Sequence, residues 1–195
     1  MPIQIGAKPD HTFREPLGLL SDCHRRIEKF LDQLLLVAEQ ARGGPLTEPL
    51  REALDTALRY FRKAAPLHTA DEESSLFPRM RATGDPAAAE AFAALESLET
   101  EHRAADADHA EVDTLGQKWL AEGFLSSADT ERLTKTLQRL KALYARHIAV
   151  EDLEVFPLAG KLLSQEELRT VGREMATRRG LDAETIHPQP SCKHK

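Results

Sequence analysis

The chain has 195 residues, of which 41% are hydrophobic and 30% charged, and its formal net charge at pH 7 is −6. This length fits one domain with a sizeable core. The acidic balance, and the lack of a basic cluster interleaved with aromatic residues, argue against nucleic acid as a main partner.

Cysteine content and hydropathy bear on where the protein works. Cys23 and Cys192 are the two cysteines, which is too few for a disulfide framework and fits a reducing compartment. The first residues contain no apolar signal core, and no apolar run approaches the roughly 18 residues needed to span a bilayer. We therefore expect a cytoplasmic protein that does not bind membranes.

The first helix is expected at about residues 16–42, after an extended arm. Pro16 suits a helix start, and Gly43-Gly44-Pro45 suits its end. The apolar positions of this helix repeat nearly as a heptad, and His24 falls on that apolar face. A lone core histidine bonded to a neighbour is the simplest interpretation of His24 taken alone.

The second helix is expected at about residues 49–77, with Pro66 inside it. Proline removes a backbone donor, so the pattern predicts a kink or short break just before His68. Residues 79–86 are expected to form the crossing to the second half of the chain. Asp85-Pro86 is a good cap and first-turn signal for the next helix.

Three more helices follow in the predicted order. One covers about residues 86–121 and ends at Gly123; the next begins near a cap at Ser127 or Asp129 and reaches about residue 161. A short helix at about residues 165–178 begins with a Ser-x-x-Glu capping box. The expected organisation is a helical bundle at 13–162, a short C-terminal helix at 163–180, and flexible termini at 1–12 and 181–195.

A repeated motif organises this pattern. The segments from His68 to Pro78 and from His147 to Pro157 both read His-x-Ala-x-Glu-acid, with Phe-Pro beginning nine residues after the histidine. Histidine and glutamate four residues apart share one helix face. The repeat extends backwards, because Leu17, Leu20, His24 and Arg25 recur as Leu95, Leu98, His102 and Arg103. The chain is therefore predicted to be a doubled two-helix unit.

Six residues follow from this repeat as candidate metal ligands. They are His24, His68, Glu72, His102, His147 and Glu151. In an up-down-up-down four-helix bundle, a rise of about 1.5 Å per residue allows all four histidines to share one layer. The fold class expected is therefore all-α.

Two inward-facing carboxylates need a positive partner. Burying an ionised carboxylate alone is so costly that it would take up a proton instead, and no Lys or Arg lies on the apolar faces at this layer. Six ligands are too many for one tetrahedral zinc ion. They suit two ions that share bridging carboxylates, with iron first and manganese or zinc behind it. The alternative is a polar network bridged by water.

These residues and their spacing resemble the hemerythrin-like domain, also called the HHE cation-binding domain, over about residues 13–162. The resemblance implies a four-helix bundle around a non-haem di-iron centre. It implies that the six candidates are ligands, that Glu72 and Glu151 bridge the irons, and that an oxo, hydroxo or water group forms a third bridge.

The chain departs from the oxygen-carrying hemerythrins on the third helix, which reads His102-x-x-x-Asp106 instead of His-x-x-x-His. On the fourth helix Asp152 keeps the carriers' His-x-x-x-x-Asp spacing after His147, although the internal repeat favours Glu151, which mirrors Glu72. Whether Asp106 or Asp152 also ligates a metal stays open at this point. The lost histidine favours redox, sensing or nitric-oxide-related chemistry over simple oxygen carriage.

For several other residues, both a role at the metal site and a simpler structural role are compatible with the sequence. Tyr144 lies one turn before His147, where its hydroxyl could bond a metal-bound group or simply a core neighbour. Asp106 and Glu28 each follow a lone histidine by four residues and could approach the site or remain in solvent. His109 is expected to support or pack beside the site. Cys23 is expected to be a packed, inert thiol.

Three functions are compatible with this sequence. The protein could bind or sense oxygen, nitric oxide or iron, with a redox or iron-handling role. It could instead be a di-iron enzyme acting on peroxide or nitric oxide, in stress response or iron-cluster repair. It could also be a structural metal bundle without ligand chemistry. The redox partner and the oligomeric state are left open, with a homodimer among the options.

Overall fold

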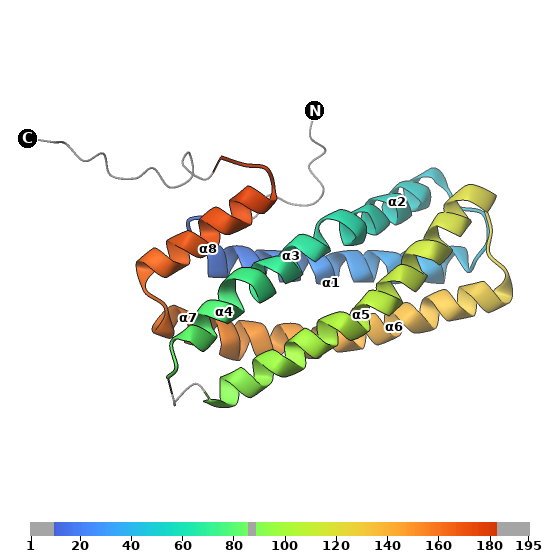
Figure 1. The fold of residues 1–195 in the computed structure, drawn as a ribbon. Helices are drawn as coiled ribbons and strands as arrows, with labels where there is room; N and C mark the ends of the chain where they lie inside the picture. The colour runs from blue at the N-terminus through green and yellow to red at the C-terminus, as the bar shows by residue number, and fades with distance from the viewer. Residues whose placement is uncertain (1–9, 86–88, 183–195) are drawn as a thin grey trace, which may run out of the picture.

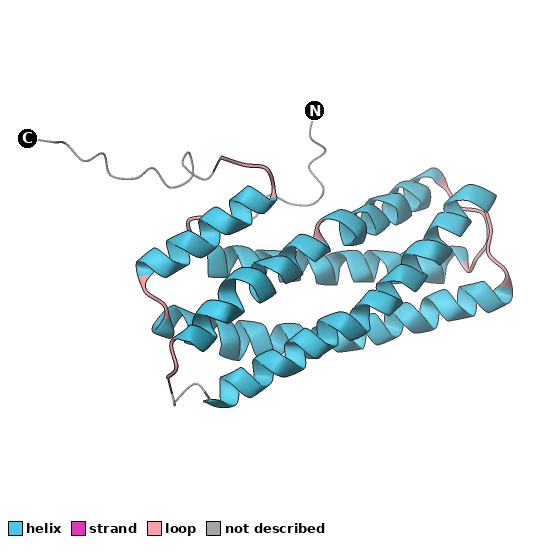
Figure 2. Cartoon of the chain, in the orientation of Figure 1, coloured by secondary structure: helices cyan, strands magenta, loops and turns pink. Residues whose placement is uncertain are grey.

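A computed structural model of the chain describes residues 10–85 and 89–182. The secondary structure of these two segments is helical and includes no strand (Figure 2). Within them, no helix combines the length and the hydropathy that a bilayer crossing requires. Most of the predicted flexible termini lies outside the described residues, as does Pro86 of the predicted cap.

The first helix, α1 (Pro16–Ala41), matches its prediction closely. Pro16 occupies the first turn, where its missing N–H leaves no hydrogen bond unmade. The helix ends because Arg42 and Gly43 adopt left-handed conformations, with φ of 48° and 75°. The N–H of Arg42 still donates to the carbonyl of Ala38, which closes the last turn.

The second helical rod is interrupted as Pro66 predicts. It consists of α2 (Glu48–Lys63), α3 (Ala65–Asp71), the π-helical turn η1 (Glu72–Leu76) and α4 (Phe77–Ala82). The break falls at Ala64, two residues before the proline. The rod continues further than predicted, however, so the expected crossing at 79–86 was wrong for its first four residues. Pro78 does not stop the helix, because it lies in the first turn of α4, where no N–H is required.

The second half repeats this design. It contains α5 (Ala89–Glu122), α6 (Ser127–Val150), the π-helical turn η3 (Glu151–Val155), α7 (Phe156–Leu162) and α8 (Gln165–Arg178). The predicted cap of α6 was wrong by one residue. Extended Ser126 is the cap, and its hydroxyl accepts from the N–H of Asp129. The capping box of α8 is confirmed at Ser164 and Glu167.

The long helices lie lengthwise beside one another (Figure 1). Helix α1 packs against α2 and α6, α2 packs against α5, and α5 packs against α6. The α1–α2 and α5–α6 turns meet at one end, where the N–H of Leu125 donates to the carbonyl of Gly43 and the indole of Trp119 donates to Gly44. Helix α8 lies toward the opposite end, against α1, α3 and η1.

The apolar core of the described residues is divided into two clusters. The turn-end core includes Leu31, Leu34, Leu54, Leu58, Val112, Trp119, Leu133 and Leu137. The α8-end core includes Leu20, Leu76, Phe77, Met80, Val155, Phe156, Val171 and Met175. A layer of buried polar side chains separates the two apolar clusters. Along each helical rod, the buried apolar residues on one side of the candidate metal ligands belong to one cluster, and those on the other side belong to the other cluster.

Candidate metal centre

Each of the six candidate residues sits on a defined element. His24 lies on α1, His68 on α3, His102 on α5 and His147 on α6, while Glu72 and Glu151 are the first residues of the π-helical turns η1 and η3. Their exposed fractions run from 0% for both glutamates to 7% for His102. The structure therefore places all six predicted residues inside the molecule.

The π-helical turns are a local feature shared by both repeats. The N–H of Phe77 donates to the carbonyl of Glu72, and the N–H of Phe156 donates to that of Glu151, five residues apart in each case. Such turns widen the helix and recur at functional sites. Pro78 and Pro157 lie two residues beyond these turns, in the first turn of α4 and of α7, where no N–H is required.

The four imidazoles turn the same nitrogen toward the two carboxylates. His68 Nε2 lies 3.2 Å from Glu72 Oε1, and His147 Nε2 lies 3.3 Å from Glu151 Oε2. His24 Nε2 lies between the glutamates, 3.1 Å from Glu151 Oε2 and 3.8 Å from Glu72 Oε1. His102 Nε2 lies 3.6 Å from the other Glu72 oxygen, Oε2.

These atoms divide into two groups that could each hold a cation. The first comprises His24, His68, Glu72 and Glu151; the second comprises His102, His147 and Glu151. Within each group the ligand atoms lie within 4.8 Å of one another. Glu151 belongs to both groups, and Glu72 directs one oxygen toward His68 and the other toward His102. Both carboxylates can therefore span two neighbouring ions.

The donor atoms at the centre lack hydrogen-bond partners. Both oxygens of Glu72, both oxygens of Glu151, and Nε2 of His24 and His147 are buried without a hydrogen bond of acceptable geometry in the described part of the chain. The short distances between them are therefore contacts, not directed bonds. Leaving buried polar atoms unpaired is costly, and a central cation would satisfy them all. The residues thus fit a metal.

Carboxylates hold three of the imidazoles from outside. Nδ1 of His24 lies 3.0 Å from Asp152 Oδ1, Nδ1 of His102 lies 2.8 Å from Glu73 Oε1, and Nδ1 of His147 lies 3.1 Å from Glu101 Oε2. An acceptor at Nδ1 keeps the proton there and leaves the Nε2 lone pair for a cation. Asp152, whose role the sequence left open, contacts the outer side of His24 in this structure.

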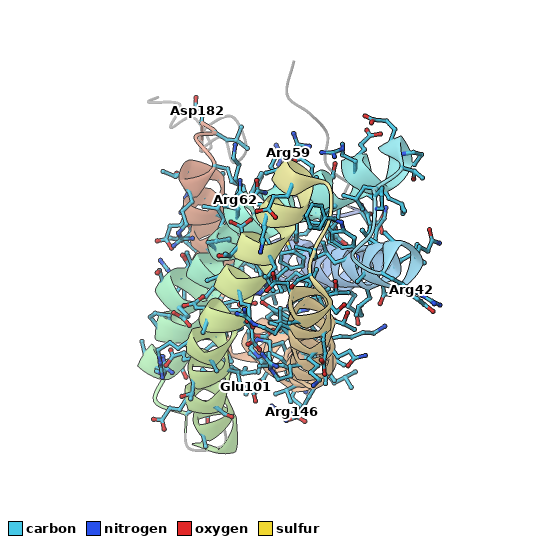
Figure 3. The ribbon with its side chains drawn as sticks, turned by 90° about the vertical axis from the view of Figure 1, so that its right-hand side faces the viewer. Arg42, Arg59, Arg62, Glu101, Arg146 and Asp182 are labelled. Atoms are coloured by element: carbon cyan, nitrogen blue, oxygen red, sulfur yellow. The ribbon has the colours of Figure 1, made fainter. Side chains whose placement is uncertain are left out.

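Further contacts fix these outer carboxylates. The hydroxyl of Ser21 donates to Asp152 Oδ1 at 2.7 Å, and Arg146 Nη2 donates to Glu101 Oε1 at 2.7 Å. Figure 3 shows Glu101 and Arg146 close together where α5 and α6 meet. The imidazole orientation is therefore supported by groups that reach the protein surface.

Glu73 and Glu101 were not identified from the sequence. A signal for Glu73 was available, because an acidic residue follows the glutamate in both copies of the motif. The two acids act crosswise: Glu73, in the first motif, bonds His102 of the second unit, whereas Asp152, in the second motif, bonds His24 of the first. Glu101 has no counterpart in the repeat, since Cys23 precedes His24.

Burial and mutual repulsion set the protonation of the centre. Burial, and then the charge of Glu151, raise the pKa of Glu72 to about 8. Burial also disfavours the ionised form of Glu151, but the nearby imidazoles of His147 and His24 outweigh the effect of burial and lower the pKa of this carboxyl. Burial lowers the pKa of His68 well below its ordinary value. The protein alone thus keeps one carboxyl protonated near neutral pH, and a cation would allow both to ionise.

The remaining predicted residues lie at different depths. Tyr144 is buried, and its hydroxyl lies 2.8 Å from His109 Nε2. Its ring centroid lies 6.1 Å from that of His147. Asp106 and Glu28 are exposed. Cys23 is buried, and burial raises the pKa of its thiol, as expected of a packed thiol.

Comparison with known proteins agrees with this geometry. A family profile described as Hemerythrin HHE cation binding domain matches residues 15–159. The chain is also 27% identical over 173 residues to an uncharacterized protein of Haemophilus influenzae, covering 86% of this chain and 92% of that protein. The matched range contains all six buried ligand candidates and both π-helical turns.

Proposed function

Because this chain belongs to the hemerythrin HHE cation-binding family, we propose that its six buried residues hold two iron ions. The observation that carries this proposal is the set of unpaired donor atoms at the centre, which face one another across the polar layer. We further propose that residues 13–162 form the up-down-up-down four-helix bundle of the family, with residues 163–180 as a short added helix.

The donor set supports iron over its rivals. One ion would take His24 and His68, and the other would take His102 and His147, with Glu72 and Glu151 shared between them. Mixed imidazole and carboxylate donors suit iron, with manganese or zinc as weaker candidates. We propose that a shared oxo or hydroxo group would complete such a centre, as the resemblance to the family implies.

The protein residues have three tasks in this proposal. The glutamates supply negative charge, the histidines supply neutral nitrogen donors, and Asp152, Glu73 and Glu101 hold those rings in orientation. The apolar clusters on either side exclude water from the layer. A bound di-iron centre would supply reversible electron transfer and an open position for a small ligand.

The proposed activity is binding of oxygen or nitric oxide, in a sensing, redox or iron-handling role. The exposed position of Asp106 supports an open ligand position, because this side chain does not add a seventh group to the buried layer. An enzyme that acts on peroxide or nitric oxide is the second candidate. The Tyr144–His109 hydrogen bond favours it, because a hydroxyl and an imidazole can exchange a proton close to His147.

Optical spectroscopy of the iron-loaded protein tests this proposal. Azide, oxygen and nitric oxide should each change the absorption bands of the iron centre, whereas zinc-loaded protein should show no change. Repeated turnover of added peroxide or nitric oxide would favour the enzyme. Iron bands that none of these ligands alters would contradict both candidates and leave a structural metal bundle.

A further inference from the structure

We propose that a hollow between α2, α3 and α5 binds a small uncharged gas molecule, which then reaches the metal centre past His109 and Tyr144. This inference rests on the function proposed above and adds to it a site that the ligand occupies before it reaches the metal. The hollow has a volume of about 190 Å³. It lies beside the break between α2 and α3, where the chain leaves regular helix at Ala64.

The walls of the hollow are mainly hydrocarbon. Leu58 and Phe61 of α2, Pro66 of α3, and Ala110 and Val112 of α5 line it. Arg62 and Asp113 are the charged lining residues, and they form an ion pair with each other. This pairing leaves little field to attract an ion, so the lining suits an uncharged ligand.

The size and lining together indicate the class of ligand. A water molecule occupies about 30 Å³ of liquid, and enclosed apolar cavities of about 150 Å³ stay dry and bind benzene or xenon. This hollow is apolar on its inner wall and opens to solvent beside the Arg62–Asp113 pair, so a ligand enters it from the surface. A diatomic gas is small and weakly polar, so it loses little by leaving water for such a space. Peroxide and other strongly hydrogen-bonding molecules fit these walls poorly.

The inner wall of the hollow leads to the proposed centre. His109 lines the hollow, and its ring stacks on Phe61 with centroids 4.9 Å apart. On its other side, His109 Nε2 meets the Tyr144 hydroxyl at 2.8 Å. Tyr144 in turn lies edge-on to His147. Two side chains therefore separate the hollow from a proposed iron ligand.

The His109–Tyr144 pair is suited to act as a gate. Burial lowers the pKa of His109 to about 4, so its ring is neutral at physiological pH and forms a neutral hydrogen bond with the Tyr144 hydroxyl. A neutral hydrogen bond of this kind contributes little net stability, so breaking it costs little. Rotation of either ring would connect the hollow with the polar layer.

A second hollow touches Tyr144 and serves as an internal comparison. It lies between α1 and α6, has a volume of about 210 Å³, and is lined partly by Glu28, Asp32 and Lys141. Lys141 and Asp32 pair with each other, as Arg62 and Asp113 do in the first hollow, but Glu28 adds a third charged side chain, which favours water over a gas. Equal access from both sides is therefore not expected, although the two spaces have similar volumes.

Two matched substitutions test the route. Ala110 and Ala145 are both exposed and each lines one hollow, so Ala110→Trp fills the apolar space and Ala145→Trp fills the charged one. Crystals held under xenon pressure report occupancy without depending on iron. Xenon should occupy the apolar hollow in the wild type and in Ala145→Trp, and should be lost in Ala110→Trp.

The association rate of the ligand measures its passage from the hollow to the metal centre. Stopped-flow mixing of iron-loaded, reduced protein with nitric oxide should give an association rate about tenfold lower in Ala110→Trp and nearly unchanged in Ala145→Trp. Ala110→Leu, a smaller change, should give an intermediate rate and covers the case in which the tryptophan variant fails to fold. Metal content and melting temperature should match the wild type in every variant compared.

The outcomes separate this inference from the proposed function. Absence of xenon from the wild-type hollow overturns the binding pocket. Equal association rates in the wild type and Ala110→Trp, or slowing confined to Ala145→Trp, overturn the route. If the iron-loaded wild type binds no nitric oxide at all, the proposed function fails, and the route fails with it, while the xenon result still decides whether the pocket exists.

Discussion

The turn-end core and the polar layer are built on the same helical rods, yet they are stabilised differently. The turn-end core is formed largely by α1, α2, α5 and α6, with regular helices and leucines that are almost fully buried. The polar layer holds four imidazoles and two carboxylates at similar burial, with a π-helical turn at each glutamate. One region is complete in itself, whereas the other has unpaired donors at its centre.

This difference shows where each region gets its stability. Burying apolar area stabilises the turn-end core directly, at roughly 25 cal/mol per Å². Burying charged groups costs free energy unless they are paired, so the polar layer depends on what it binds. Perturbations that act on one region alone should therefore separate these two sources of stability.

The largest effects are expected from two core truncations. Phe156, whose ring stacks on His24 with centroids 5.3 Å apart, belongs to the α8-end core. Phe156→Ala should cost about 3–5 kcal/mol and also weaken metal binding, because His24 loses its support. Leu137→Ala, in the turn-end core, should cost about 2–5 kcal/mol and leave metal affinity unchanged.

Denaturant unfolding with and without metal checks this pair. The cost of Leu137→Ala should be the same in both states, whereas the cost of Phe156→Ala should be larger with metal present. Equal behaviour of the two variants would mean that the regions are not energetically distinct.

Metal removal should destabilise the polar layer and spare the turn-end core. A ligand at a hundredfold excess over its dissociation constant adds about 2.7 kcal/mol to folding stability, so the metal-free protein should melt clearly lower. Hydrogen exchange should show lost protection around His24, His68, His102 and His147, and persistent protection near Leu133 and Leu137. Equal protection at both ends, with unchanged melting, would mean that the six residues form a self-sufficient polar network.

Much of this organisation could be predicted from sequence, because the relevant signals are local. Helix α1 has a proline start and a glycine stop, and α8 has a capping box, so both ranges were predicted closely. The ligand candidates were found because histidine and glutamate four residues apart share a face in both repeats. Their position in one layer was predicted from the lengths of the helices and the rise per residue along a helix.

The features that were missed depend on relations beyond a regular helix. The π-helical turns at Glu72 and Glu151 do not follow from a uniform 3.6-residue period, although the repeated Phe-Pro was a signal for them. The pairs His102–Glu73 and His147–Glu101 join different rods. Such pairs depend on how one helix is rotated against another, which spacing along a single helix does not determine.

A smaller effect is expected when an outer carboxylate is removed. Asp152→Ala should lower metal affinity by about 10–100-fold, because Nδ1 of His24 loses its acceptor. Asp152→Asn keeps an acceptor oxygen but not the charge, so its effect should be smaller. The neighbouring Leu153 is 76% exposed, and Leu153→Ala is the matched control that should leave affinity unchanged. Titration with a competing chelator measures all three; equal affinities would remove the orienting role of Asp152.

The smallest effect concerns His109, at the border between the two regions. Burial holds its pKa at about 4, below the ordinary value of 6.5. Between these values the unfolded chain binds the proton more readily, so stability falls as the pH drops through this window. Relative to pH 7, the wild type should lose about 1–2 kcal/mol more at pH 5 than His109→Gln. Parallel stability curves for the two proteins would contradict this effect.

Metal stoichiometry combined with anomalous diffraction at the iron edge would show whether the polar layer holds two ions. Protein made with iron available should contain close to two irons per chain, with two anomalous peaks between Glu72 and Glu151. Asp106→Ala should keep both, since that side chain is exposed, whereas Glu151→Ala should lower the metal content. A single zinc ion with no second metal, or a site emptied by Asp106→Ala but not by Glu151→Ala, would mean that the six residues do not hold two ions as proposed.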